Sequence, residues 1–134
     1  MSLSILSRLD RGEIVDEPFP YLHREEALDP LLYAELAGAY PSLRQLLGDR
    51  PPGNNQLFNV AAYQVMDDPA MPAIWREFFA YHCSAAFLKE VLAFWGKAID
   101  AEYPQLADWL GKPLSQVRGA RPARTRPRPT ARPT

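Results

Sequence analysis

The last sixteen residues most constrain the fold of this chain, because they contain only five residue types. From Gly119 onward only Gly, Ala, Arg, Pro and Thr occur, and prolines recur through the segment. Proline bars a regular helix, and the segment offers no large apolar side chain to a core. We therefore expect residues 118–134 to form a disordered, Arg/Pro-rich tail and residues 1–117 to form one folded region.

The charge divides at the same boundary. All 16 acidic residues precede position 109, whereas residues 1–117 contain nine basic residues, which gives this region a net charge of −7. The other six basic residues are arginines in the tail, so the overall charge of −1 describes neither part. This distribution excludes a uniformly basic nucleic-acid-binding domain, but not a basic appendage on an acidic body.

The composition of the tail has two explanations. Its arginines can bind an acidic partner or nucleic acid by neutralising phosphates, although the tail lacks aromatic residues that would stack on bases. Alternatively, Ala, Arg, Pro and Thr all have C or G at the second codon position, so a shifted reading frame of GC-rich DNA produces such runs. We favour the shifted frame, and nucleic acid is not the expected partner.

The single cysteine and the apolar runs bear on the location of the protein. Cys83 cannot form an intrachain disulfide, and a reducing cytosol agrees with this. No run approaches the roughly 18 apolar residues of a membrane span, and charges interrupt the N-terminal stretch. We expect a cytoplasmic protein without membrane contact.

Two segments carry the clearest helix signals. Asp29-Pro30 predicts a helix to about residue 40, because Asp29 can cap free amides and Pro30 needs no amide at the first helical position. Ser84 predicts a second helix cap, and the helix is expected to end at Tyr103. Its apolar residues follow the period of an amphipathic helix: Phe87, Leu88, Val91, Leu92, Trp95, Ala98 and Ile99.

Weaker signals complete a mainly α fold class with one or two short β-strands. Helices are predicted in residues 3–15, from Asp68-Pro69 or Met71-Pro72 to His82, and in residues 106–110. Residues 21–24 predict a short edge strand, residues 41–56 a loop, and residues 57–66 either a strand or irregular structure.

Two histidines and one carboxylate raise the question of a metal site. His23, Glu25 and His82 form the ligand set of a non-haem Fe(II) facial triad, with Lys89 as a cation for a carboxylate co-substrate. Such a triad needs a rigid sheet around a common cavity, and the sequence contains too few strand-like runs for one. We therefore expect both histidines at the surface or at helix boundaries.

Other reactive side chains have simpler explanations. Cys83 follows His82 directly, and adjacent helical residues do not face each other, so a buried structural thiol is expected. The carboxylate pairs Glu25-Glu26 and Asp67-Asp68 precede predicted helices and are expected to interact with helix dipoles. No phosphate-binding loop or nucleophile motif occurs in the sequence.

Three groups of residues, in order across residues 13–119, resemble one known family. They are Glu17-Pro18-Phe19-Pro20-Tyr21 with Ala27-Leu28-Asp29-Pro30-Leu31-Leu32-Tyr33-Ala34-Glu35-Leu36 and Tyr40-Pro41-Ser42; Ile74-Trp75-Arg76-Glu77-Phe78 with His82-Cys83-Ser84-Ala85-Ala86-Phe87 and Phe94-Trp95-Gly96; and Tyr103-Pro104-Gln105-Leu106 with Val117-Arg118-Gly119. In this arrangement the chain resembles the N-terminal region of 2-oxoglutarate/Fe(II)-dependent oxygenases of the prolyl-hydroxylase-like kind.

The resemblance implies a helical support region that precedes a double-stranded β-helix, or jelly-roll, barrel. In such enzymes a His-x-Asp/Glu, a distal His and a cation for 2-oxoglutarate come later, in the barrel. This chain departs from the family pattern near Gly119, before any of them. No catalytic, cofactor-binding or metal-binding residue is therefore assigned. No cofactor is expected in this chain, whereas Fe(II) and 2-oxoglutarate are expected for an intact relative.

These observations predict a truncated N-terminal part of a dioxygenase-like protein, inactive alone, whose intact relative hydroxylates an unknown substrate. One alternative is a small helical interaction module whose basic tail contacts an acidic partner or nucleic acid. Another is that His23, Glu25 and His82 do bind a metal.

A truncated support region would leave apolar helix faces without their sheet. We expect such faces around Trp75, Phe87 and Trp95, and therefore self-association of the isolated chain.

Overall fold

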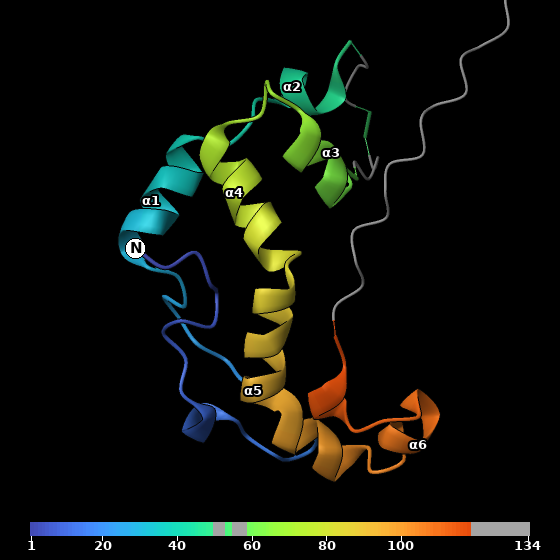
Figure 1. The fold of residues 1–134 in the computed structure, drawn as a ribbon. Helices are drawn as coiled ribbons and strands as arrows, with labels where there is room; N and C mark the ends of the chain where they lie inside the picture. The colour runs from blue at the N-terminus through green and yellow to red at the C-terminus, as the bar shows by residue number, and fades with distance from the viewer. Residues whose placement is uncertain (50–52, 55–58, 119–134) are drawn as a thin grey trace, which may run out of the picture.

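A computed structural model describes residues 1–49, 53–54 and 59–118, and its described part is mainly helical (Figure 1). The α-helices are α1 (Pro30–Gly38), α2 (Leu43–Leu47), α3 (Ala62–Asp67), α4 (Ala73–His82), α5 (Ala85–Glu102) and α6 (Leu106–Leu110), and the 3₁₀-helices are η1 (Arg11–Glu13) and η2 (Leu114–Gln116). The predicted mainly α class is confirmed. The predicted disordered tail lies, apart from Arg118, outside the described residues.

The prediction of a strand over residues 21–24 is wrong, because only Tyr21 of this segment pairs. Tyr21 alone pairs, with Val15, in an isolated antiparallel bridge closed by two backbone hydrogen bonds of 2.9 Å. Pro18 and Pro20 lie between the two residues and lack the amides that would extend a ladder. No sheet forms among the residues that the structure describes.

The predicted cap of α1 and one of the two predicted starts of α4 are observed. Asp29 Oδ1 accepts a hydrogen bond from the Leu31 amide at 2.9 Å, and Pro30 takes the first helical position. Helix α4 begins after Pro72, so the second of the two predicted starts is confirmed. Asp68 instead closes a turn before α4, because its Oδ1 accepts from the Ala70 amide at 2.8 Å.

Helix α2 lies within the segment predicted as a loop, and helix α3 lies where a strand or irregular structure was predicted. Ser42 and Gln45 form a reciprocal capping box, in which Gln45 Oε1 accepts from the Ser42 amide at 2.8 Å. Gly48, with φ of 62°, ends α2 in a conformation that favours glycine. At α3, Gln64 Oε1 accepts from the Ala61 amide at 2.9 Å. Residues 57–58 of the segment predicted as strand or irregular structure, and residues 50–52 and 55–56 of the predicted loop, lie outside the described residues.

The predicted helix in residues 3–15 is also wrong. Two isolated turns, Ser4 to Ser7 and Leu6 to Leu9, precede the short 3₁₀-helix η1. The Ser4 hydroxyl accepts from the Leu6 amide at 3.1 Å, which is a local bond that competes with a helix. Asp10 then caps η1 through the Gly12 amide at 2.6 Å.

The buried apolar side chains are confined to one end of the molecule. Those of the described residues are Leu32, Leu36, Leu47, Val65 and Met71. They belong to α1, α2, α3 and the residue before Pro72. Trp75 of α4 joins this core to α1, since its Nε1 donates to the Leu36 carbonyl oxygen at 3.1 Å.

Helix α5 is the longest helix of the described chain and buries none of its side chains. Ser84 caps it as predicted, accepting from the Phe87 amide at 3.2 Å. Figure 1 shows α5 continuing the line of α4, with the N-terminal segment along one side and α6 beyond its far end. None of the helices described here combines the length and hydropathy that crossing a bilayer requires.

Candidate functional site

The three metal-ligand candidates do not form a metal site. His23 and Glu25 are exposed on the segment that precedes α1, whereas His82 is the last residue of α4. Among residues 1–49, 53–54 and 59–118, no group of three or more His, Cys, Asp and Glu side chains is placed to hold a metal ion.

Both nitrogens of the His82 ring form hydrogen bonds with backbone groups. Its Nδ1 lies 2.7 Å from the Phe78 carbonyl oxygen, which can only accept, so Nδ1 carries the proton. Its Nε2 accepts a hydrogen bond from the Ile5 amide at 3.3 Å. The ring also packs against Phe78 and Phe87, with centroid distances of 4.1 and 4.5 Å. Neither nitrogen has a free lone pair for Fe(II), so these residues do not fit the iron of an oxygenase.

The structure corrects the expectation for Cys83. Its thiol is exposed at the junction between α4 and α5, where it was predicted to be buried. The helix break at Ser84 turns this position outward, since Cys83 is the last residue before the new N-cap.

The acidic pairs also differ from expectation in part. Asp67 is the last residue of α3, so the Asp67-Asp68 pair lies at the C-terminal end of α3 as well as before α4. Glu25 and Glu26 lie in the turn before α1, and Glu26 has a positive φ of 53°. Lys89 is exposed on α5.

A polar cluster joins the N-terminal segment to the α4–α5 junction; we call it the Glu90 cluster. Ser4 Oγ donates to one oxygen of the Glu90 carboxylate, and the Tyr81 hydroxyl donates to the other. Ser4 is only 2% exposed, although it is a polar residue. With the Ile5–His82 hydrogen bond, the cluster fixes two consecutive residues of the N-terminal segment on helices α4 and α5.

Protonation in the Glu90 cluster follows from these hydrogen bonds. Donation from Ser4, then from Tyr81, holds the pKa of Glu90 below its ordinary value of 4.5, and the nearby His82 ring adds to this. The hydrogen bond to Glu90, aided by burial and by repulsion from that carboxylate, raises the pKa of Tyr81 above its ordinary 10.0. The carboxylate therefore accepts from both hydroxyls, and the Ser4 hydroxyl also accepts from the Leu6 amide. This arrangement suits a structural contact between the segments better than acid–base catalysis.

Sequence reasoning missed the Glu90 cluster. Ser4 and Glu90 are separated by 86 positions, and a pairing over that distance leaves no local pattern. One signal was available, namely that Ser4 interrupts an otherwise apolar stretch of Leu3, Ile5 and Leu6.

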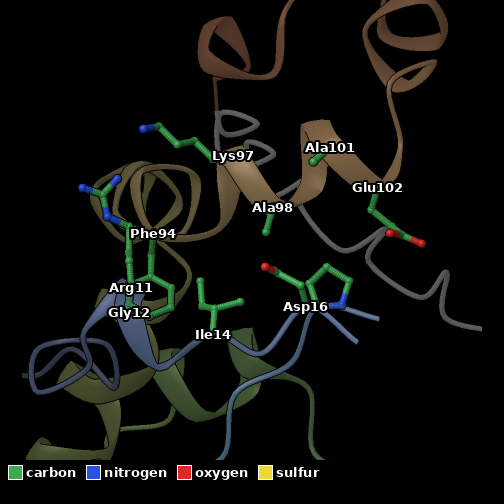
Figure 2. Close-up of a pocket in the computed structure, with 10 residues that line it drawn as sticks. Arg11, Gly12, Ile14, Asp16, Phe94, Lys97, Ala98, Ala101 and Glu102 are labelled. Atoms are coloured by element: carbon green, nitrogen blue, oxygen red, sulfur yellow. The ribbon is translucent and has the colours of Figure 1, made fainter. Parts of the chain in front are cut away.

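A cavity of about 660 Å³ lies between the N-terminal segment and the second half of α5; we call it the Lys97 cavity (Figure 2). Its apolar lining comprises Ile14, Pro20, Phe94, Ala98 and Ala101. Its charged lining comprises Arg11, Asp16, Lys97 and Glu102. Arg11 holds one wall against α5, because its Nη1 donates to the Ala93 carbonyl oxygen at 3.3 Å.

The positively and negatively charged side chains that line the Lys97 cavity lie toward different sides of it. Figure 2 shows Arg11 and Lys97 extending to the same side, whereas Asp16 and Glu102 lie toward the other side, with apolar residues between. In the described part of the chain, these four side chains form no ion pair with one another; the ion pair found there joins Arg24 and Glu13.

The apolar stripe of α5 is incompletely covered; it comprises Phe87, Leu88, Val91, Leu92, Trp95, Ala98 and Ile99. All seven are half-buried. Apolar faces around Trp75, Phe87 and Trp95 were predicted to be exposed, but these three residues are half-buried. Trp75 packs against Tyr40 and bonds to the Leu36 carbonyl oxygen, whereas η2 packs against α5. The stripe is therefore an amphipathic face without a complete partner.

Large apolar side chains are exposed elsewhere too. Leu31, Tyr33, Tyr40, Leu43 and Trp109 are each more than half exposed.

Comparison of the chain with known protein families, characterised proteins and solved structures finds no match.

Proposed function

We propose that this chain is a non-catalytic support region of a 2-oxoglutarate- and Fe(II)-dependent dioxygenase-like protein. Its α5 stripe docks on a β-sheet that lies outside the chain. The observation that carries the proposal is that the apolar stripe of α5, an 18-residue amphipathic helix, is only half-buried and includes no fully buried side chain. A stripe of this kind stabilises a fold when another layer covers it, and a sheet face is one of the two common covers.

The position of the core supports the same assignment. The five buried apolar side chains hold α1 to α3 and the start of α4 together, but they leave α5 outside. The Glu90 cluster and Arg11 then fix the N-terminal segment along one side of α5. This arrangement makes α5 a rigid, pre-positioned surface, which a helix that supports a sheet requires.

The chemistry is assigned to the docked sheet and not to this chain. In the resembled family the iron ligands and the cation for 2-oxoglutarate belong to the barrel. In this chain His23 is exposed, and both ring nitrogens of His82 form hydrogen bonds with backbone groups. The chain therefore contributes support, and an intact relative would supply Fe(II)- and 2-oxoglutarate-dependent hydroxylation.

The DNA that follows codon 118, read in the other two frames, tests this proposal. We expect one frame to encode alternating apolar strands with a His-x-Asp or His-x-Glu, followed by a distal His and a later Arg or Lys. If neither frame encodes such a pattern, the support-region proposal is wrong.

A further inference from the structure

We propose that the Lys97 cavity binds short peptides that have free termini and apolar side chains. This goes beyond the support function, because the site lies between α5 and the N-terminal segment and needs no sheet. The cavity volume of about 660 Å³ falls within the roughly 300–1,000 Å³ that small-ligand sites enclose.

The cationic side selects a carboxylate. Arg11 and Lys97 extend to the same side of the cavity, and both side chains are exposed at its rim (Figure 2). Arg11 is fixed by its bond to the Ala93 carbonyl oxygen through Nη1, which leaves its other guanidinium donors available. A ligand carboxylate placed there would accept charge-assisted hydrogen bonds from both residues.

The opposite side selects a cation. Asp16 and Glu102 are exposed carboxylates, and neither accepts a hydrogen bond from another residue in the described part of the chain. An ammonium group placed beside Asp16 would pair with its carboxylate, whereas a second anion would be repelled. A fatty acid or a phosphate monoester therefore matches only half of the cavity.

The lining between the two sides is apolar and half-buried. Ile14, Pro20, Phe94 and Ala98 provide this surface. A free amino acid carries both charges on one carbon, so it cannot place them at opposite sides of a cavity. A tripeptide separates its termini by up to about 10 Å when it is extended, and its side chains can cover the apolar lining.

Calorimetric titration of the full chain with the tripeptide Leu-Ala-Leu tests the proposal. We expect saturable binding, and we expect N-acetylation or C-amidation of the peptide to weaken it by about three- to tenfold each. The absence of saturable binding, or equal affinity for all three peptides, would overturn the proposal.

Charge variants assign each peptide end to its side of the cavity. Lys97→Met should weaken binding of the free and acetylated peptides but not of the amidated peptide, which has no carboxylate. Asp16→Asn should weaken binding of the free and amidated peptides but not of the acetylated one. Lys89→Met and Asp100→Asn are matched controls, because these charges on or near α5 do not line the cavity, and they should change nothing. A uniform loss for all peptides in every variant would contradict the assignment.

Discussion

Ser4 donates its hydroxyl hydrogen bond to the carboxylate of Glu90, 86 residues further along the chain. The Ser4 side chain is buried, whereas Glu90 is half-buried. Together with the Ile5–His82 bond, it fixes an N-terminal segment that has no regular helix of its own apart from η1. The position of that segment along α5 depends on these few polar contacts.

Ser4→Ala should lower the free energy of unfolding by about 1–2 kcal/mol. The substitution removes a buried donor to a charged acceptor and leaves one Glu90 oxygen without its partner. Urea unfolding followed by circular dichroism measures the change. Ser2→Ala is the control, since Ser2 is exposed and accepts only one weak bond of 3.3 Å from the Ser4 amide. Equal effects of the two substitutions would contradict the role given to Ser4.

The stability that Glu90 contributes should depend on pH in one direction. Its pKa in the folded chain is lowered, so its contribution is complete above the ordinary value of 4.5. The contribution is lost as the pH falls below 4.5 through the folded value, because protonation removes the charged acceptor of Ser4 and Tyr81. The unfolding free energies of the wild type and Glu90→Gln should therefore converge in acid. A difference that stays constant across this range would show that the carboxylate charge is irrelevant.

Two adjacent leucines of α1 provide a matched pair for the core. Leu32 is 0% exposed and Leu31 is 71% exposed. Leu32→Ala should cost about 2–5 kcal/mol, since it leaves a cavity in the small core, whereas Leu31→Ala should stay within about 0.5 kcal/mol. Thermal and urea unfolding of both variants measure these values. Comparable losses for the two variants would mean that the core is not at the α1–α4 end.

The chain alone should not form an iron–2-oxoglutarate complex. Both nitrogens of His82 are engaged with the backbone, and His23 lies on a different, exposed segment. Anaerobic titration with Fe(II) and 2-oxoglutarate should therefore give no metal-to-ligand charge-transfer band. A clear band that disappears in His23→Ala would establish the metal-binding alternative.

The starts of two helices could be predicted because their signals are local. Asp29-Pro30 and Ser84 predict the starts of α1 and α5 because a cap is formed by residues within one turn. The start of α2 carried the same kind of signal, Ser42 with Gln45, but the glycines and prolines that follow it favoured a loop.

The contacts around the two candidate sites could not be predicted from the sequence. Ser4 with Glu90 and Arg11 with Ala93 join segments more than 80 residues apart, and such pairings depend on how the whole chain packs. The predicted helix in residues 3–15 failed for a related reason. Its leucine spacing is helical, but the Ser4 side chain forms tertiary and local bonds instead.

Sedimentation velocity of the full chain over a concentration series tests the central claim, that the α5 stripe is a docking face. We predict concentration-dependent self-association of the wild type, since no sheet within the described part of the chain covers the stripe. Trp95→Glu should shift the chain toward monomer, whereas Trp109→Glu, at a 74% exposed position outside the stripe, should leave association unchanged. A monodisperse wild-type monomer at all concentrations, or association that only Trp109→Glu abolishes, would contradict the claim.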